Sequence, residues 1–211
     1  MATGLGMGLS AEAIRQGLDH VANAEPKIAA ALERAGYPEP RIRATGYATL
    51  LRTIVGQQVS VAAAASVWRK LEALLGHDVP PEKLLAADFD ALRACGFSRQ
   101  KQGYARSLCE LTVSGELDLD ALPADDDEAI AELTRIKGIG RWSAEIYLLF
   151  AEGRADIWPA GDLAVQAGLA KLLGHDARPD EKATRALAEP WRPHRGAMAI
   201  FTWHCYNNPA L

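Results

Sequence analysis

The stretch that decides the fold is Leu133-Thr134-Arg135-Ile136-Lys137-Gly138-Ile139-Gly140-Arg141-Trp142-Ser143-Ala144. Its two glycines stand one residue apart between segments that carry apolar residues at helical spacing. Glycine tolerates a positive φ angle and lets another backbone approach closely. A helix that begins directly after such a turn presents unpaired N–H groups, which attract an anion such as a phosphate. The stretch therefore predicts two helices joined by a tight turn, with an anion site at the turn.

Basic side chains flank this turn. Arg135, Lys137 and Arg141 supply local positive charge, although the whole chain has a formal net charge of −4. An acidic balance counts against a broad basic face for nucleic acid, so a contact of this kind must be local. Gly138 and Gly140 alone are equally typical of a plain helix–helix turn, and only the longer string favours a specific function.

The rest of the chain predicts an all-α protein. Its 211 residues, 49% of them hydrophobic, are enough for one large or two small domains. Ala, Leu, Glu, Lys and Arg dominate, and alternating β-branched residues are sparse. Apolar spacing and end signals place helices at about 10–21, 26–35, 45–55, 60–75, 81–85, 89–94, 98–113, 125–136, 142–151, 162–173, 179–189 and 196–206.

The sequence also argues against several classes of protein. The longest weakly polar run, residues 59–68, is far shorter than the ~20 apolar residues of a membrane helix. Residues 1–9 are Gly-rich without a basic segment, so we expect a flexible leader and no secretory signal. Cys95, Cys109 and Cys205 stand singly, with neither metal-ligand spacing nor a disulfide pattern. A cytoplasmic protein without a membrane anchor is the expectation.

The hairpin string resembles the helix-hairpin-helix element of base-excision DNA glycosylases, whose pattern is L-x-x-I/L-x-G-I/V-G-x-x-x-A. Each further segment that resembles this superfamily is short, but together they follow in order at sensible spacings. They are the segment that begins a helix at the DNA minor groove (54–61), L-R-x-x-G-x-S-x-x-K (92–101), P-x-x-D (159–162) and W-x-P-x-R with a later Trp (191–203). The last resembles the 3-methyladenine DNA glycosylase II branch.

The resemblance implies two helical lobes with an active site in the cleft between them. The middle lobe would span residues 46–151 and end with the hairpin, and the second would combine residues 10–45 with 152–211. Some relatives carry an extra N-terminal α/β domain. The residues before the family core read as helical here, so we do not expect that domain.

Asp162 is the expected catalytic residue. It opens a predicted helix, and an ordinary N-cap aspartate, which contributes ~1 kcal/mol, is the simpler interpretation. The two roles are compatible, because a helix N-terminus favours an ionised carboxylate. A fixed negative charge stabilises the oxocarbenium-like sugar that forms as a base departs, and can also orient the attacking water. A cationic alkylated purine leaves as a neutral molecule and needs no strong general acid.

Aromatic rings attract a cationic base by ~0.5–2 kcal/mol. The candidates for the base pocket are Trp142 and Trp203, followed by Tyr147, although Trp203 beside Phe201 could equally be a core residue. The resemblance makes Trp142 informative about the reaction, because bifunctional relatives carry a Schiff-base lysine at this position. A tryptophan there predicts simple hydrolysis. Some branches hold a four-cysteine iron–sulfur cluster, which three scattered cysteines do not supply.

The resemblance also implies DNA contacts and a bound ion. Gln58 aligns with the wedge that fills the gap left by a flipped nucleotide, and Gln57 with a contact to the opposite strand or wedge base; a polar helix-start pair is the simpler interpretation of both. Carbonyls of the hairpin bind a monovalent cation, Na⁺ or K⁺, in the family, which here implies Ile136, Gly138 and Ile139. The full expected DNA-binding set is Gln57, Gln58, Ser60, Lys137, Gly138, Ile139, Gly140 and Arg141.

The expected protein is therefore a monomeric, monofunctional DNA glycosylase acting on duplex DNA. It would flip out alkylated purines such as 3-methyladenine and 7-methylguanine and leave an abasic site. Two alternatives stay open at this point. One is a catalytically inert helix-hairpin-helix DNA-binding module, and the other is a glycosylase for oxidised or deaminated bases.

Overall fold

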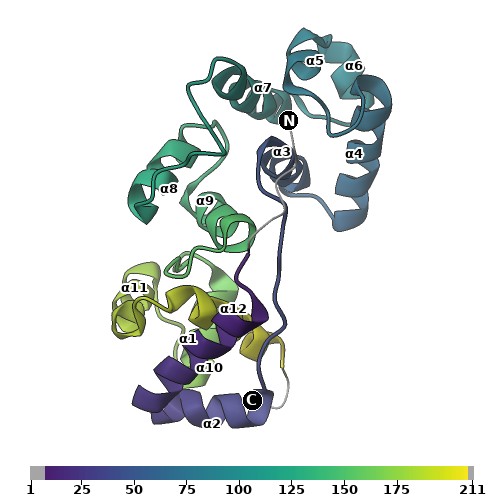
Figure 1. Cartoon of the computed structure of the whole chain (residues 1–211). Coiled ribbons are helices and arrows are strands. Elements are labelled where there is room, and N and C mark those ends of the chain that lie inside the picture. Colours follow the sequence, from purple (N-terminus) through teal and green to yellow (C-terminus); the bar gives the residue numbers. More distant parts are fainter. Residues whose placement is uncertain (1–7, 209–211) are drawn as a thin grey trace. The chain divides into compact units, whose positions relative to one another are not determined.

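The computed structural model describes residues 8–208, which form helices joined by turns and loops (Figure 1). These residues contain no strand, so the all-α prediction is confirmed. The chain divides into two compact units. Within the described part, unit 1 consists of residues 44–144 and unit 2 of residues 8–43 and 145–208. No helix among these residues is both long enough and apolar enough to cross a membrane.

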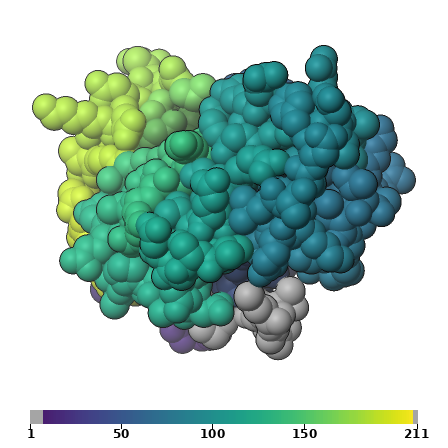
Figure 2. All heavy atoms as spheres, turned by 90° about the horizontal axis from the view of Figure 1, so that it is seen from above, coloured from purple at the N-terminus to yellow at the C-terminus, as the bar shows by residue number. Residues whose placement is uncertain are grey.

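Unit 1 is built around one long helix, α7. Helices α3 and α5 pack along it, α6 contacts it, and α4 packs on α3. Leu51, Leu71, Leu84, Phe97 and Leu108 are fully buried between these helices. In the space-filling view, the blue and teal atoms of this unit lie packed against one another (Figure 2). The helices are α3 (Tyr47–Gly56), α4 (Val61–Leu75), α5 (Pro81–Ala86), α6 (Phe89–Ala94), α7 (Arg99–Val113) and α8 (Asp126–Thr134).

Unit 2 is built around α12, which packs against α1 and α10. Gly168 of α10 lies so close to Thr202 of α12 that an added Cβ would stand 2.6 Å from the Thr202 carbonyl oxygen. Only a residue without a side chain allows these two helices to approach this closely. The helices are α1 (Ala11–Ala24), α2 (Pro26–Ala35), η1 (Leu148–Glu152), α10 (Leu163–Leu173), α11 (Glu181–Ala188), η2 (Glu189–Trp191) and α12 (Arg195–Asn207).

Most helix starts lie where the cap residues predicted them. The side chains of Ser10, Ser60, Ser98 and Asp162 accept backbone N–H groups at the starts of α1, α4, α7 and α10. Each satisfies a donor that the first helical turn leaves unpaired. Helix α2 begins at Pro26, as expected for a residue whose ring fixes a helical φ angle.

The helix predicted at 142–151 differs from the structure. Helix α9 covers Arg141–Tyr147, and the backbone then widens into a π-helix, η1, over Leu148–Glu152. The Gly153 N–H bonds to the Leu148 carbonyl five residues earlier, and Gly153 ends the turn at a φ angle of 72°. Apolar spacing does not distinguish a π turn from an α turn over so short a segment.

The predicted flexible leader, residues 1–9, reaches the described part of the chain only at its last two residues. Residues 1–7 lie outside the described residues, but Gly8 and Leu9 are buried, and Leu9 is only 7% exposed. A Cβ on Gly8 would stand 2.8 Å from the Phe150 carbonyl oxygen. Gly8 and Leu9 thus pack within unit 2, a contact that glycine content alone did not indicate.

Candidate active site and hairpin

Asp162 is a half-buried N-cap of α10. Its Oδ1 atom accepts the Ala164 N–H at 2.8 Å and the Val165 N–H at 2.9 Å. The simpler interpretation of this residue is therefore correct as far as it goes. The two bonds also fix the orientation of the carboxylate, since the donors belong to the rigid first turn of a helix.

A third donor reaches the same oxygen from α12. The Trp203 indole Nε1–H donates to Asp162 Oδ1 at 3.1 Å. Trp203 is 8% exposed, and its ring centroid lies 5.5 Å from that of Phe150 in η1. The close contact between Gly168 and Thr202 brings α12 near enough for this bond. Trp203 is thus both a buried aromatic residue and a hydrogen-bond partner of the candidate catalytic residue, and Phe150 was missed by the sequence reasoning.

The loop before Asp162 is held by side chains that the sequence reasoning missed. The amide of Gln166, one helical turn after Asp162, donates to the Ala160 carbonyl at 2.8 Å, and Gln166 is buried. The indole N–H of Trp158 donates to the Thr184 carbonyl at 3.0 Å. A polar residue four positions after a helix N-cap lies above it on one face, and this spacing was the available signal for Gln166.

A buried carboxylate lies in the same unit. Glu145 is 2% exposed and pairs with Arg185 at 3.2 Å. Arg185 also bonds Glu181 at 2.8 Å. The Glu181 carboxylate in turn lies 3.4 Å from the position a Cβ would take on Gly161, directly before Asp162. A buried charge requires a partner, and Arg185 supplies it from α11, whose Glu181 lies beside the loop that carries Asp162.

The other two predicted pocket aromatics differ in exposure. Tyr147 is only 3% exposed and belongs to the core of unit 2. Trp142, in unit 1, is 47% exposed and presents a large apolar surface. Of the three predicted pocket aromatics, only Trp142 therefore has an exposed ring, whereas the rings of Tyr147 and Trp203 are covered.

The two glycines of the hairpin have different roles. Gly138 has a φ angle of +83°, and a Cβ there would stand 2.2 Å from the Tyr104 ring. Gly140 has no positive φ angle, and an added Cβ would meet nothing within 4 Å. The expectation of a left-handed glycine is correct only for Gly138. The backbone at Gly140 faces open space, and α9 begins at the next residue.

The basic residues around the hairpin are mostly engaged in ion pairs. Arg141 bonds Asp127 at 2.7 Å. Arg135 bonds Glu132 at 2.6 Å and Glu116 at 3.2 Å. The expected positive charge of Arg135 and Arg141 is therefore largely neutralised within unit 1, whereas the side chain of Lys137 is exposed.

The segment between α3 and α4 holds three of the residues that were expected to contact DNA. Gln57 is half-buried, and its Nε2 donates to the Gly138 carbonyl at 2.8 Å. Gln58 is exposed, with a φ angle of +54°. Ser60 Oγ accepts the Ala63 N–H at 3.2 Å, so the hydroxyl is a helix cap. Val61 is 88% exposed. The amide of Gln57 and the hydroxyl of Ser60 already have partners, although both were expected to contact DNA.

Two of the three carbonyls of the expected cation site accept hydrogen bonds within the protein. The Gly138 carbonyl accepts the Gln57 amide at 2.8 Å and keeps a second lone pair. The Ile136 carbonyl accepts the Ile139 N–H at 3.0 Å and keeps a second lone pair. The carbonyls of Ile136, Gly138 and Ile139 thus remain compatible with a monovalent ion, and the cation site stays a prediction.

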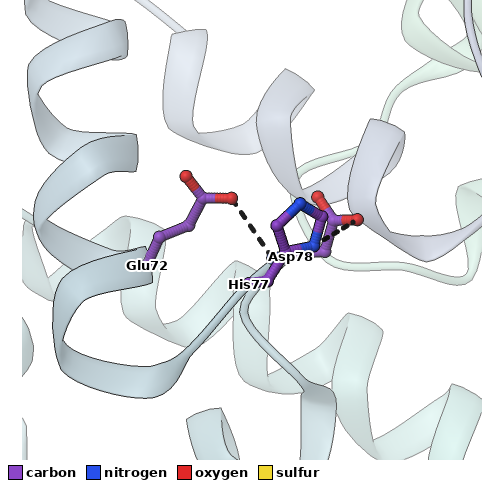
Figure 3. A group of neighbouring side chains, drawn as sticks. All are labelled: Glu72, His77 and Asp78. Atoms are coloured by element: carbon purple, nitrogen blue, oxygen red, sulfur yellow. Dashed lines mark hydrogen bonds and ion pairs between the residues drawn. The ribbon is translucent and has the colours of Figure 1, made fainter.

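A second polar group lies at the end of α4 (Figure 3). Glu72 accepts the Asp78 N–H at 3.2 Å, and His77 Nδ1 lies 3.2 Å from Asp78 Oδ2. The Arg52 guanidinium pairs with Asp78 at 3.4 Å and stacks 3.7 Å from the Trp68 ring centroid. Because Arg52 supplies the positive charge, these side chains form a structural ion-pair cluster that joins α3 to α4.

The cysteines do not form a reactive centre. All three are buried free thiols. Burial raises the pKa of Cys109 to about 11 and that of Cys205 to about 12. A thiol with such a pKa is protonated at neutral pH and is a poor nucleophile. Cys109 and Cys205 are therefore poor candidates for a nucleophile.

Comparison with known proteins identifies relatives. Residues 51–193 match the model of the family described as "HhH-GPD superfamily base excision DNA repair protein". The chain is 34% identical over 161 residues to DNA-3-methyladenine glycosylase 1 of Schizosaccharomyces pombe. The alignment covers 74% of this chain and 71% of the relative.

Two solved structures of 3-methyladenine DNA glycosylases resemble this chain. The chain matches DNA-3-methyladenine glycosidase from Bacillus halodurans with a TM-score of 0.84 and 30% identity, covering 91% of this chain and 89% of that one. It matches the S. pombe 3-methyladenine DNA glycosylase in complex with abasic DNA with a TM-score of 0.78 and 28% identity. That match covers 93% of this chain and 98% of the other.

Proposed function

Because this chain belongs to the HhH-GPD superfamily of base excision DNA repair proteins, we propose that it hydrolyses the N-glycosidic bond of alkylated purines in duplex DNA. The substrates would be bases of the 3-methyladenine and 7-methylguanine type, and the product an abasic site. The observation that supports this most directly is the Asp162 carboxylate, oriented by three N–H donors and adjacent to the Trp203 ring.

Asp162 acts on the sugar. As the base departs, positive charge develops on the deoxyribose, and a carboxylate fixed in advance stabilises that charge without having to reorganise. The bonds to Ala164 and Val165 hold the carboxylate at the helix N-terminus, and the Trp203 bond fixes it from the side. The same carboxylate orients the water that attacks the sugar. One carboxylate suffices because a cationic alkylated purine leaves as a neutral base.

Recognition of the base follows from its charge. A cationic purine is attracted to the electron-rich face of an aromatic ring by ~0.5–2 kcal/mol. Trp203, backed by Phe150, and the exposed Trp142 are the rings proposed for this role. Trp142 also occupies the position of the lysine of bifunctional relatives, which favours hydrolysis over strand cleavage.

Duplex DNA is bound at the hairpin. The open backbone at Gly140 and the start of α9 accommodate a phosphate, and Lys137 is exposed beside them. A Na⁺ or K⁺ ion held by the carbonyls of Ile136, Gly138 and Ile139 would add positive charge next to this phosphate. We propose that the enzyme acts as a monomer, because one chain supplies both the hairpin and Asp162.

The test compares two aspartates with the same capping geometry. Asp125 Oδ1 accepts the N–H groups two and three residues later, both at 3.0 Å, as Asp162 does. Asparagine is an equally good N-cap, so Asp162→Asn and Asp125→Asn should fold equally well. Release of 7-methylguanine from duplex DNA should fall by about 10²- to 10³-fold in Asp162→Asn alone, by analogy with the loss of one preorganised electrostatic group.

Three outcomes separate the alternatives. Wild-type rates in Asp162→Asn would refute the assignment of Asp162. Duplex binding by the wild-type protein without release of any alkylated base would favour an inert DNA-binding module. Release of oxidised or deaminated bases from a lesion panel, with alkylated bases untouched, would keep the enzyme and change its substrate class.

A further inference from the structure

The amide of Gln57 points at the protein's own hairpin. Gln57 is the C-cap of α3, and its Nε2 donates to the Gly138 carbonyl at 2.8 Å, across 81 residues of sequence. A side-chain amide that satisfies a turn carbonyl is part of the scaffold. The adjacent Gln58 is exposed, and its backbone turns to a positive φ angle. Neighbouring glutamines thus have different surroundings.

Gly138 is held from a second side. The Tyr104 ring of α7 fills the space where a side chain would lie, with its Cδ2 atom 2.2 Å from the Cβ position. The turn at Gly138 is therefore clamped between an aromatic ring and the Gln57 amide. Neither contact involves a group that the hairpin presents to solvent at Gly140, where an added Cβ meets nothing within 4 Å.

Helix α7 links the two partners of this bond. Lys101, Tyr104 and Ser107 follow at intervals of three, so they share one face of the helix. Lys101 Nζ donates to the Val55 carbonyl at the end of α3, at 2.7 Å. Ser107 Oγ accepts the Lys137 N–H at 3.1 Å. The end of α3 and the hairpin are thus both hydrogen-bonded to α7. The bond from Gln57 to Gly138 joins the end of α3 directly to the hairpin.

We propose that Gln57 is a positioning residue, whose amide holds the hairpin turn at a fixed distance from the segment that follows α3. The inference rests on the proposed function, because its ligand is duplex DNA. In that function the segment after α3 enters the opened duplex, and the hairpin contacts a phosphate. Both must meet the same DNA, so their spacing has to be set in the free protein. Gln57 contributes by bonding Gly138 and not by touching DNA.

The first measurement uses the full-length protein without DNA. Gln57→Met keeps a long, neutral side chain but removes the donor, and Gln58→Met is its matched neighbour. Amide hydrogen exchange is read at Ile139, whose N–H bonds Ile136, and at Lys137, whose N–H bonds Ser107. Loss of one neutral hydrogen bond should accelerate exchange at both by about two- to tenfold in Gln57→Met. Gln58→Met should leave both unchanged.

The second measurement uses an undamaged duplex and a 7-methylguanine duplex. The dissociation constant for the undamaged duplex should rise in Gln57→Met by a factor similar to the increase in exchange. The dissociation constant for the 7-methylguanine duplex should rise in Gln57→Met by a similar factor, because both duplexes meet the same hairpin. Gln57→Glu, which has the same shape but no donor, should accelerate hairpin exchange at least as much.

Each other result is decisive. Weaker duplex binding with unchanged exchange at Lys137 and Ile139 would make Gln57 a DNA contact and overturn the inference. Unchanged binding together with unchanged exchange would also overturn it, as would faster exchange spread through the α3, α4 and α7 amides, which indicates general destabilisation. If the wild-type protein releases no base, the proposed function fails, but hairpin exchange and duplex affinity still decide the role of Gln57.

Discussion

The two hairpin glycines should respond in opposite ways to alanine. In Gly138→Ala the residue must adopt a φ angle of +83°, which costs ~1–2 kcal/mol for a residue with a Cβ. The new methyl group would also stand 2.2 Å from the Tyr104 ring, so the ring must move. Overpacking of this kind costs ~1–3 kcal/mol. The free energy of unfolding should therefore fall by about 2–5 kcal/mol.

Gly140→Ala is the matched control. Its φ angle is not positive, and its Cβ would enter open space. Replacing a glycine that has a compatible backbone stabilises a protein by ~0.4–1 kcal/mol through the unfolded state, so the free energy of unfolding should stay level or rise slightly. Duplex affinity should nevertheless fall, because the methyl group occupies the space proposed for the phosphate.

Urea unfolding followed by circular dichroism measures both variants, and a double-mutant cycle separates the two terms. In a Tyr104→Ala background the ring is absent, so Gly138→Ala should cost only the backbone part, ~1–2 kcal/mol. An equal cost in both backgrounds would disprove the contact with Tyr104. A cost for Gly140→Ala as large as that for Gly138→Ala would refute the distinction between the two glycines.

Three further predictions concern unit 2 and the thiols. Trp203→Phe removes the N–H donor to Asp162 but keeps a ring beside Phe150, so single-turnover base release should fall by at least about tenfold; an unchanged rate would make the bond irrelevant. Gly168→Ala should lower the free energy of unfolding by ~1–3 kcal/mol, because its Cβ would stand 2.6 Å from the Thr202 carbonyl oxygen; urea unfolding that matches the wild type would contradict this. Cys109 and Cys205 have pKa values of about 11 and about 12 in the fold, above their ordinary 9.0. The unfolded state therefore loses these protons first, and their contribution to stability should decline as pH rises above 9.0 toward these folded values, which unfolding measured against pH would show.

Local signals explain why much of the fold was predictable. Ser10, Ser60, Ser98 and Asp162 cap their helices with their own side chains, within three residues of the cap. Such short-range chemistry can be read from the sequence without knowing the tertiary contacts. The same holds for Asp162 as an N-cap, so its position at the start of α10 followed directly from the sequence.

Long-range partners explain the rest. The bond from Gln57 to Gly138 and the ion pair of Glu145 with Arg185 join residues that are 81 and 40 apart in the chain. Whether an amide contacts DNA or a distant carbonyl depends on packing that no local pattern encodes. The pairing of Arg141 with Asp127 has the same origin, which is why residue type alone suggested an available cation at the hairpin.

The π turn η1 determines which side chain contacts the Trp203 ring. A π turn holds one residue more than an α turn, and each residue advances a helix by about 100°. Deleting a single residue within Leu148–Glu152 would close this wide turn and rotate a different side chain toward the ring that Phe150 now contacts. The length of this short segment, independently of its composition, thus selects the aromatic neighbour of Trp203.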